Sequence, residues 1–231
     1  YLQPRATPQQ QAISHSLVID PPPAQHMTMQ DVFGNTRHFF SLQAAHKQLR
    51  VVARSLVRTQ TQPSPPSTVS WEQVRERFRY TPDHPFDAAA EFVFASPYVP
   101  RHADFAAYAR PSFGAGQPLV AAARDLMHRI HTDFTYESQS TEVNTPALGA
   151  LAQRKGVCQD FAHIMISGLR GLGIPAAYVS GYIRTIPAPG TKRLEGADAM
   201  HAWVGVWAGP NQPSSPPICS GAGRSSTGRN A

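Results

Sequence analysis

Cysteine is scarce in this sequence, whose 231 residues contain only Cys158 and Cys219. Two cysteines cannot build the disulfide framework of a small secreted protein, so we expect free thiols, a reducing compartment and a cytoplasmic location. There is no signal-peptide pattern and no apolar run of the about 18 residues that a spanning helix needs, so we expect neither secretion nor a membrane partner. The chain begins with Tyr1 and not with methionine, which leaves an upstream leader open.

Long runs of one charge are also lacking. The net charge is +6 and the pI is about 9.7, but the basic residues are scattered and form no basic run interleaved with aromatic residues. We therefore expect a solvated basic surface and no nucleic-acid partner. The hydrophobic share of 41% is sufficient for a packed core in one large domain or two small ones.

The pattern of residues 1–62 predicts an N-terminal β domain. Apolar and polar side chains alternate from Ile13 to Ile19, and residues 49–57 form a second candidate strand. Between them, Gly34 and Asn35 suit a tight turn, because both residues tolerate positive φ. The proline-rich stretch 62–67 interrupts regular structure, and we place the domain boundary there.

Residues 70–209 predict a second domain that mixes helices and strands. Ser70 with Gln73 resembles a capping box, and Pro118 precedes an apolar stripe that continues to Ile130. Thr145 and Pro146 predict a brief helix to about residue 154, which Gly156 is expected to end. Strands are predicted from residue 176 to 184 and around residue 201. Residues 210–231 are rich in Ser, Pro, Gly and Arg, so we expect a disordered tail.

The stretch around Cys158 carries the main functional signal. Phe161, Ile164, Met165 and Leu172 recur at helical spacing, which predicts an amphipathic helix that begins at the cysteine. The free N–H groups and the positive end of the helix dipole at such a position favour a thiolate and can hold an oxyanion. Cys158 is therefore a candidate nucleophile, and the alternative is a small buried hydrophobic residue.

His201 is the candidate general base that goes with this thiol. It lies in the apolar run 198–207, which has strand character and offers a rigid support for an imidazole. The alternative is a satisfied core histidine. Trp203 shares the strand face of His201, where it either shields the imidazole from water or packs in the core. His163 follows Cys158 by five helical positions, which rotate it about 140° away, so we expect a structural role.

Four further residues have roles that we expect to be minor. Asp160 lies in the first helical turn, where capping fits better than catalysis. Asp198 precedes His201 by an odd number of strand positions, so it is poorly placed to orient the imidazole. Asn211 lies among prolines and suits a loop, and Cys219 lies in the expected tail without a nearby base.

Several motifs together resemble the bacterial transglutaminase-like cysteine protease family. They are residues 145–146, 156–162, 171–176, 179–182 and 198–204, and residues 1–62, with Phe33-Gly34-Asn35 and Phe40-Ser41-Leu42, resemble the β domain that precedes the core in that family. The likeness covers most of residues 1–208. It implies a papain-like α+β core with a small β domain before it, acyl transfer from an amide or peptide carbonyl to water or an amine, no cofactor and no metal. Cys158 would match the family's nucleophile and His201 its base.

The third catalytic residue departs from this pattern. Family members carry an aspartate on the strand after the histidine, but residues 202–231 contain no Asp or Glu. We therefore expect a core without its last strands, altered after Gly209 by a shifted reading frame or a premature boundary. Two functions stay open: an impaired cysteine hydrolase or acyltransferase that acts on a peptide or protein substrate, and a non-catalytic or truncated member with a binding or structural role.

Overall fold

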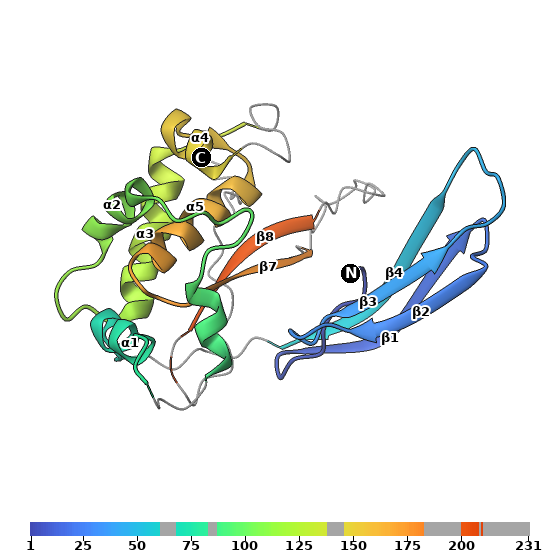
Figure 1. Cartoon of the computed structure of the whole chain (residues 1–231), viewed down its shortest axis with the longest axis horizontal. Helices are drawn as coiled ribbons and strands as arrows, with labels where there is room; N and C mark the ends of the chain where they lie inside the picture. Colours follow the sequence, from blue (N-terminus) through green and yellow to red (C-terminus); the bar gives the residue numbers. More distant parts are fainter. Residues whose placement is uncertain (61–67, 83–86, 138–145, 183–199, 208, 210–231) are drawn as a thin grey trace, which may run out of the picture. The chain divides into compact units, whose positions relative to one another are not determined.

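The computed structural model describes residues 1–60, 68–82, 87–137, 146–182, 200–207 and 209. The chain divides into two compact units, Tyr1–Pro63 and Ser64–Ala231. Figure 1 shows strands in the first unit and a mixture of helices and strands in the second. The predicted α+β class is confirmed.

The first unit consists of two antiparallel strand pairs. Strand β1 (Gln10–Asp20) pairs with β4 (Arg50–Thr59), and β2 (Gln25–Gln30) pairs with β3 (Thr36–Ser41). The turn between β2 and β3 forms as the sequence predicts. The carboxylate of Asp31 accepts the N–H groups of Phe33 and Asn35, and Gly34 has a φ of 77°. This turn requires the positive φ that glycine adopts without strain.

Polar side chains lie between the strands of this first unit where an apolar core is usual. His15 on β1 hydrogen-bonds to Ser55 on β4 at 2.8 Å, and His26 on β2 hydrogen-bonds to His38 on β3 at 3.1 Å. The rings of His15 and His38 lie 6.0 Å apart, so the two strand pairs meet through imidazoles. Residues 1–60 are all described, and none of them is buried. Hydrophobic burial therefore contributes little to this unit.

The second unit begins with helices whose starts were predicted. Ser70 and Gln73 form the expected capping box before α1, and Pro118 precedes α3. The predicted apolar stripe of α3, from Leu119 to Ile130, is buried. The elements of this unit are α1 (Trp71–Arg77), the 3-10 turns η1 (Ala88–Val93) and η2 (Arg110–Ser112), α2 (Ala103–Ala109), α3 (Leu119–Asp133), β5 (Thr135–Tyr136), α4 (Ala147–Gln153), β6 (Lys155–Gly156), α5 (Cys158–Gly171), β7 (Ala176–Tyr182) and β8 (Met200–Val206).

Helix α5 is the central element of the second unit. All its residues from Asp160 to Arg170 are buried, because α2, α3 and α4 pack around it and the β7–β8 hairpin covers its other side (Figure 1). Gly168 permits the closest of these approaches. A Cβ at this position would lie 2.9 Å from the Cβ of Ala109 and 3.2 Å from the carbonyl oxygen of Phe105, both on α2. A side chain here would therefore separate the two helices.

A buried arginine connects the end of α5 to the start of β7. The guanidinium of Arg170 donates to the carbonyl oxygen of Ala176 through Nε at 3.0 Å and Nη2 at 2.8 Å, and Nη1 donates to the carbonyl oxygen of Phe94. The two bonds to Ala176 satisfy a carbonyl group that burial would otherwise leave unpaired. They also show that β7 begins at the C-terminal end of α5 and runs back along the helix.

Candidate functional site

Cys158 is the first residue of α5, as the sequence predicts. Val157 before it is extended, with φ −114° and ψ 178°, so the helix starts directly at the cysteine. The side chain of Cys158 is half-buried and forms no disulfide. The free N–H groups of the first helical turn and the helix dipole surround the sulfur with positive potential.

Asp160 caps the helix that carries the thiol. Its Oδ2 accepts the backbone N–H of Val157 at 2.8 Å, which agrees with the expected capping role. The carboxylate folds back over Gly156, where a Cβ would lie 2.7 Å from Oδ2 and 2.8 Å from the Cβ of Asp160. Position 156 therefore requires glycine because Asp160 occupies the space of a side chain.

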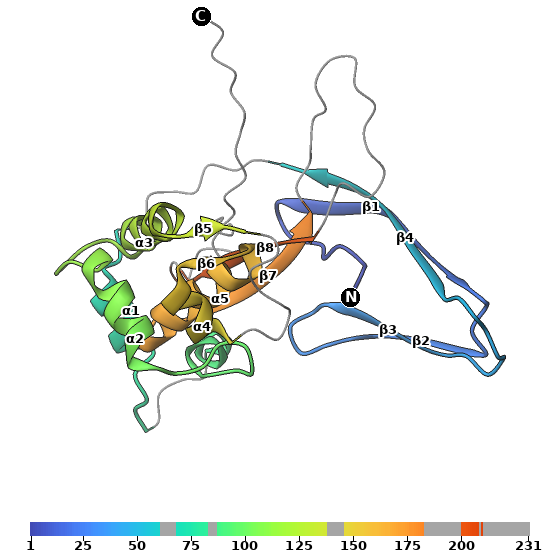
Figure 2. The ribbon, with the colours of Figure 1, turned by 90° about the horizontal axis from the view of Figure 1, so that it is seen from above.

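The expected role of Gly156 as a helix terminator is wrong. Helix α4 ends at Gln153, and Arg154 adopts the left-handed conformation with φ 55° and ψ 34°. Gly156 lies instead in β6, which pairs in parallel with β5, so that Tyr136 is the partner of Gly156 (Figure 2). This short ladder holds the segment before Cys158 and places Tyr136 beside it.

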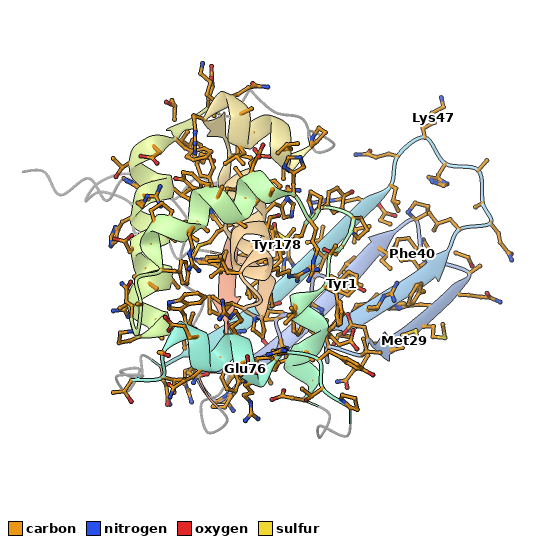
Figure 3. The ribbon with its side chains drawn as sticks, turned by 60° about the vertical axis from the view of Figure 1, so that its left-hand side comes forward. Tyr1, Met29, Phe40, Lys47, Glu76 and Tyr178 are labelled. Carbon is orange, nitrogen blue, oxygen red and sulfur yellow. The ribbon has the colours of Figure 1, made fainter. Side chains whose placement is uncertain are left out.

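Two tyrosines lie near the thiol. Burial raises the pKa of Tyr136, and the electrostatic interaction with Cys158 raises it further. The same two causes, in the same order, raise the pKa of Tyr178 on β7. Tyr178 is labelled in Figure 3, and its ring lies 5.2 Å from that of His163 on α5. Cys158 is thus flanked by tyrosines from two different strands.

His201 lies on β8, opposite Gly181 in the antiparallel β7–β8 pair. Tyr178 is level with His163 along α5, and Gly181 lies about 10 Å further along β7, at about 3.3 Å per residue. Cys158 lies about 7.5 Å from His163 in the same direction, at about 1.5 Å per residue. His201 and Cys158 therefore occupy the same end of the α5 and β7–β8 layer.

The two faces of the hairpin have different surroundings. Ala202, Val204 and Val206 alternate onto the face that packs with α5 in the core. His201 and Trp203 alternate onto the other face, with their rings 6.1 Å apart. Trp203 therefore shares the face of His201, as the sequence predicts. No hydrogen bond joins Cys158 to His201, which are both described residues, so their contact stays a prediction.

His163 has the surroundings of a structural residue. Its buried ring stacks on Tyr98 at a centroid distance of 5.6 Å and also contacts Tyr178. Burial lowers the pKa of His163, and the nearby Asp160 partly opposes that effect. A neutral ring held between two tyrosines agrees with the structural role that its helical position predicts.

Other predicted residues lie outside the described part of the chain. They are Asp198, Asn211, Cys219 and the tail 210–231. Sequence reasoning missed Tyr136 and Tyr178 near the thiol, and it missed Tyr98, which stacks on His163. The period-two alternation in 176–182 could have placed Tyr178 on the helix-facing side, but no pattern marked Tyr98 or Tyr136.

Two surface hollows lie away from the thiol. The larger, of about 590 Å³, is at the C-terminal end of α5, and the smaller is about 370 Å³. Neither is lined by Cys158 or His201. Within the described ranges, no group of three or more His, Cys, Asp or Glu side chains is arranged to hold a metal ion. No helix in those ranges is both long and apolar enough to cross a membrane, and the cytoplasmic location stays a prediction.

Family comparisons match both units of the chain. Residues 106–213 match the transglutaminase-like superfamily, and residues 1–58 match the bacterial transglutaminase-like N-terminal region. An uncharacterised protein of Mycobacterium tuberculosis is 41% identical over 220 residues, which cover 92% of this chain and 68% of that protein. An uncharacterised protein of Mycobacterium leprae is 33% identical over 192 residues, or 78% of this chain and 61% of that protein. The chain spans about two thirds of the length of these relatives.

A solved structure agrees with these matches. A candidate cysteine protease from Cytophaga hutchinsonii superposes with a TM-score of 0.63 and 23% identity, over 89% of this chain and 65% of the other. A cysteine at the start of a central helix that packs on an antiparallel hairpin defines the second unit as a papain-like α+β fold. The chain belongs to the transglutaminase-like superfamily and carries the N-terminal region of its bacterial members.

Proposed function

We propose that this protein is a cysteine hydrolase or acyltransferase that acts on peptide or glutamine amide bonds, with Cys158 as nucleophile and His201 as general base. The position of Cys158 as the first residue of the buried helix α5 carries this proposal. Helix N-termini lower the pKa of thiols and supply N–H donors to an oxyanion, which is what attack on an amide carbonyl requires.

The reaction would proceed through a thioester. The sulfur of Cys158 attacks the carbonyl carbon, and the N–H groups of the first turn of α5 stabilise the oxyanion that forms. His201 takes the thiol proton and returns it to the leaving amine as the C–N bond breaks. Water or a second amine then attacks the thioester and releases Cys158, which gives hydrolysis or transfer.

Turnover is proposed to be impaired, because residues 202–231 provide no carboxylate to hold the imidazole of His201. In related catalytic arrangements the acid fixes the tautomer of the histidine and supports the imidazolium, while the thiolate and the oxyanion donors act separately. Loss of the acid should therefore lower the turnover rate much more than it lowers the rate at which Cys158 is alkylated.

The test first compares the alkylation rates of the two thiols and then the activity of the variants on peptides. Iodoacetamide at neutral pH should label Cys158 faster than Cys219, as measured by mass spectrometry of peptides over time. The Cys158→Ser variant should be inert on glutamine-containing peptides, whereas Cys219→Ser should match the parent protein. Equal labelling rates for the two thiols would remove the support for an activated nucleophile.

The second candidate is a non-catalytic protein that keeps the fold for binding. Two observations favour it: residues 202–231 lack an acid, and His201 lies on the hairpin face that does not pack on α5. It predicts no turnover even at high protein concentration, together with equal peptide capture by the parent protein and Cys158→Ser. Turnover that Cys158→Ser abolishes would exclude it.

A further inference from the structure

Three histidines connect the two strand pairs of the first unit. His15 lies on β1, His26 on β2 and His38 on β3, and Figure 2 shows the β1–β4 and β2–β3 pairs as separate ribbons. The ring centroid of His38 lies 5.3 Å from that of His26 and 6.0 Å from that of His15. We call these three residues the histidine cluster. Its contact between His15 and His38 crosses from one strand pair to the other.

The hydrogen bonds of the cluster suit neutral imidazoles. Nε2 of His26 and Nδ1 of His38 lie 3.1 Å apart, so one of these nitrogens donates a proton and the other accepts it. If both rings were protonated, both nitrogens would be donors and this bond would be lost. The Nε2 atoms of His15 and His38 are enclosed and have no hydrogen-bond partner among the described residues, which disfavours a charged N–H there.

The strand faces that meet at the cluster carry no charged side chain other than the histidines. Side chains alternate in direction along a strand and cross-strand partners share a face, so the register defines each face. Uncharged residues, among them Leu17, Thr28, Phe40 and Ser55, share the faces of the cluster. The charged residues of the four strands all alternate onto the opposite faces, and they are Asp20, Arg37, Arg50, Arg54 and Arg58.

Protonation of the cluster would therefore place like charges together without a carboxylate to compensate them. Burial lowers the pKa of His38, and the positive charges of His26, His15 and the N-terminal amine lower it further. Like charges within about 6 Å disfavour each other's charged form. Because the pKa of His38 is lowered in the closed state, the open state binds the proton more strongly. The closed state then loses stability as the pH falls below the usual histidine pKa of about 6.5.

We infer that the histidine cluster is an acid-sensitive contact, which joins the β1–β4 and β2–β3 pairs at neutral pH and releases them as the pH falls towards 5. Residues 1–60 contain no buried residue, so few apolar contacts oppose this release. Separation of the pairs would expose the side chains on the meeting faces, such as Phe40 (Figure 3). Histidine clusters change interfaces in this way over the same pH range in other proteins.

Hydrogen exchange of the full chain at pH 7 and pH 5.5 tests this inference, with peptides resolved by mass spectrometry. Labelling times are scaled for the pH dependence of intrinsic exchange, and EDTA keeps metal ions away from the imidazoles. The opening equilibrium of β1 to β4 should increase by at least about tenfold at the lower pH. The physical reason is that each proton bound on opening contributes up to a factor of about ten per pH unit.

Two variants remove one titrating group each. His38→Asn keeps a polar side chain near the position of the Nδ1 atom that bonds to His26, and it should reduce the pH-dependent increase by a factor of about 3 to 10. His15→Asn should have the same effect from β1, and it replaces His38→Asn if that variant does not fold. His46→Asn is the matched control, because His46 is exposed and lies outside the strands, with its Nδ1 3.0 Å from the carbonyl oxygen of Ala44.

Three results would overturn the inference. The first is equal opening of β1 to β4 at the two pH values in the parent chain. The second is an increase that both His15→Asn and His38→Asn leave unchanged, and the third is a reduction by His46→Asn as large as that by His38→Asn. A reduction by either cluster variant without one by His46→Asn supports the inference. None of these readouts depends on the reactivity of Cys158, so they are separate from failure of the proposed function.

Discussion

Gly156 shows how one missing side chain positions the candidate nucleophile. The carboxylate of Asp160 fills the space beside the Cα of Gly156 and accepts the N–H of Val157, which fixes Val157 as the N-cap, so that α5 starts at Cys158. A carboxylate in this position also favours helix formation through the dipole. The glycine, the aspartate and the cysteine thus form one local unit.

Replacement of Gly156 by alanine should destabilise the protein by about 2 kcal/mol, because the new Cβ displaces Asp160 and the cap is lost. Urea denaturation followed by circular dichroism measures this change. Gly149→Ala is the matched control, since nothing lies within 4 Å of a Cβ on that residue of α4. The control should gain about 0.5 to 1 kcal/mol from helix propensity. Equal effects of the two substitutions would contradict the close contact at Gly156.

His163 should make stability depend on pH in a defined direction. Burial lowers its pKa in the folded protein, so the unfolded chain binds a proton at a pH where the folded chain does not. The free energy of unfolding should then fall as the pH drops below the usual histidine pKa of about 6.5, by at most about 1.4 kcal/mol per pH unit for this one group.

His163→Phe keeps an aromatic ring between Tyr98 and Tyr178 but cannot bind a proton. As the pH falls from 7 to 5, the free energy of unfolding of the parent should therefore decrease relative to that of this variant. Urea titrations at several pH values measure the difference. A difference that does not change with pH would mean that His163 titrates equally in both states.

At the scale of elements, Arg170 holds the connection between α5 and β7. Its three donor atoms bind the carbonyl group of the buried Ala176 and that of the exposed Phe94. The planar guanidinium can reach both carbonyl groups at once, which the single ammonium group of a lysine cannot do. This connection sets where β7 begins, and through the β7–β8 register it sets the position of His201.

Arg170→Met should cost about 2 kcal/mol, because the buried carbonyl group of Ala176 loses its donors and the bond to Phe94 is also lost. Arg170→Lys should recover part of that loss. Arg101→Ala serves as the control and should change stability by less than about 0.5 kcal/mol, as Arg101 is exposed. Thermal denaturation of the three variants measures the order of their stabilities. A loss for Arg101→Ala as large as that for Arg170→Met would contradict this role.

At the scale of the whole molecule, the two units differ in how they are stabilised. Residues 1–60 contain no buried side chain and place three histidines between their strand pairs, whereas residues 160–170 of α5 are all buried. Local opening costs less where few apolar contacts are lost.

Hydrogen exchange should therefore be faster in β1 to β4 than in α5. Mass spectrometry of peptides under native conditions measures this, and we expect protection of α5 to exceed that of β1 by at least about tenfold, a difference of about 1.4 kcal/mol in opening free energy. Helix α1, of which only Trp71 and Val74 are buried, provides an internal comparison in the second unit. Equal protection of β1 and α5 would show that the first unit is as stable as the second.

Local patterns in the sequence predicted much of this protein. The alternation from Ile13 to Ile19, the Gly34–Asn35 turn, the Ser70–Gln73 capping box and the helix that begins at Cys158 all depend on neighbouring residues, so their periodicity is visible in the chain. The resemblance of the ordered motifs around Cys158 and His201 indicated the family, and the comparisons confirm it.

Only the tertiary structure decided which distant residues pack on α5. Tyr98, Tyr136 and Tyr178 come from three separate segments and meet at α5 through ring contacts. The need for glycine at position 156 likewise depends on where the Asp160 side chain lies, and the role of Arg170 depends on where the carbonyl groups of Phe94 and Ala176 lie. Sequence periodicity reports the direction of a side chain from its own element, whereas packing between elements decides what that side chain contacts.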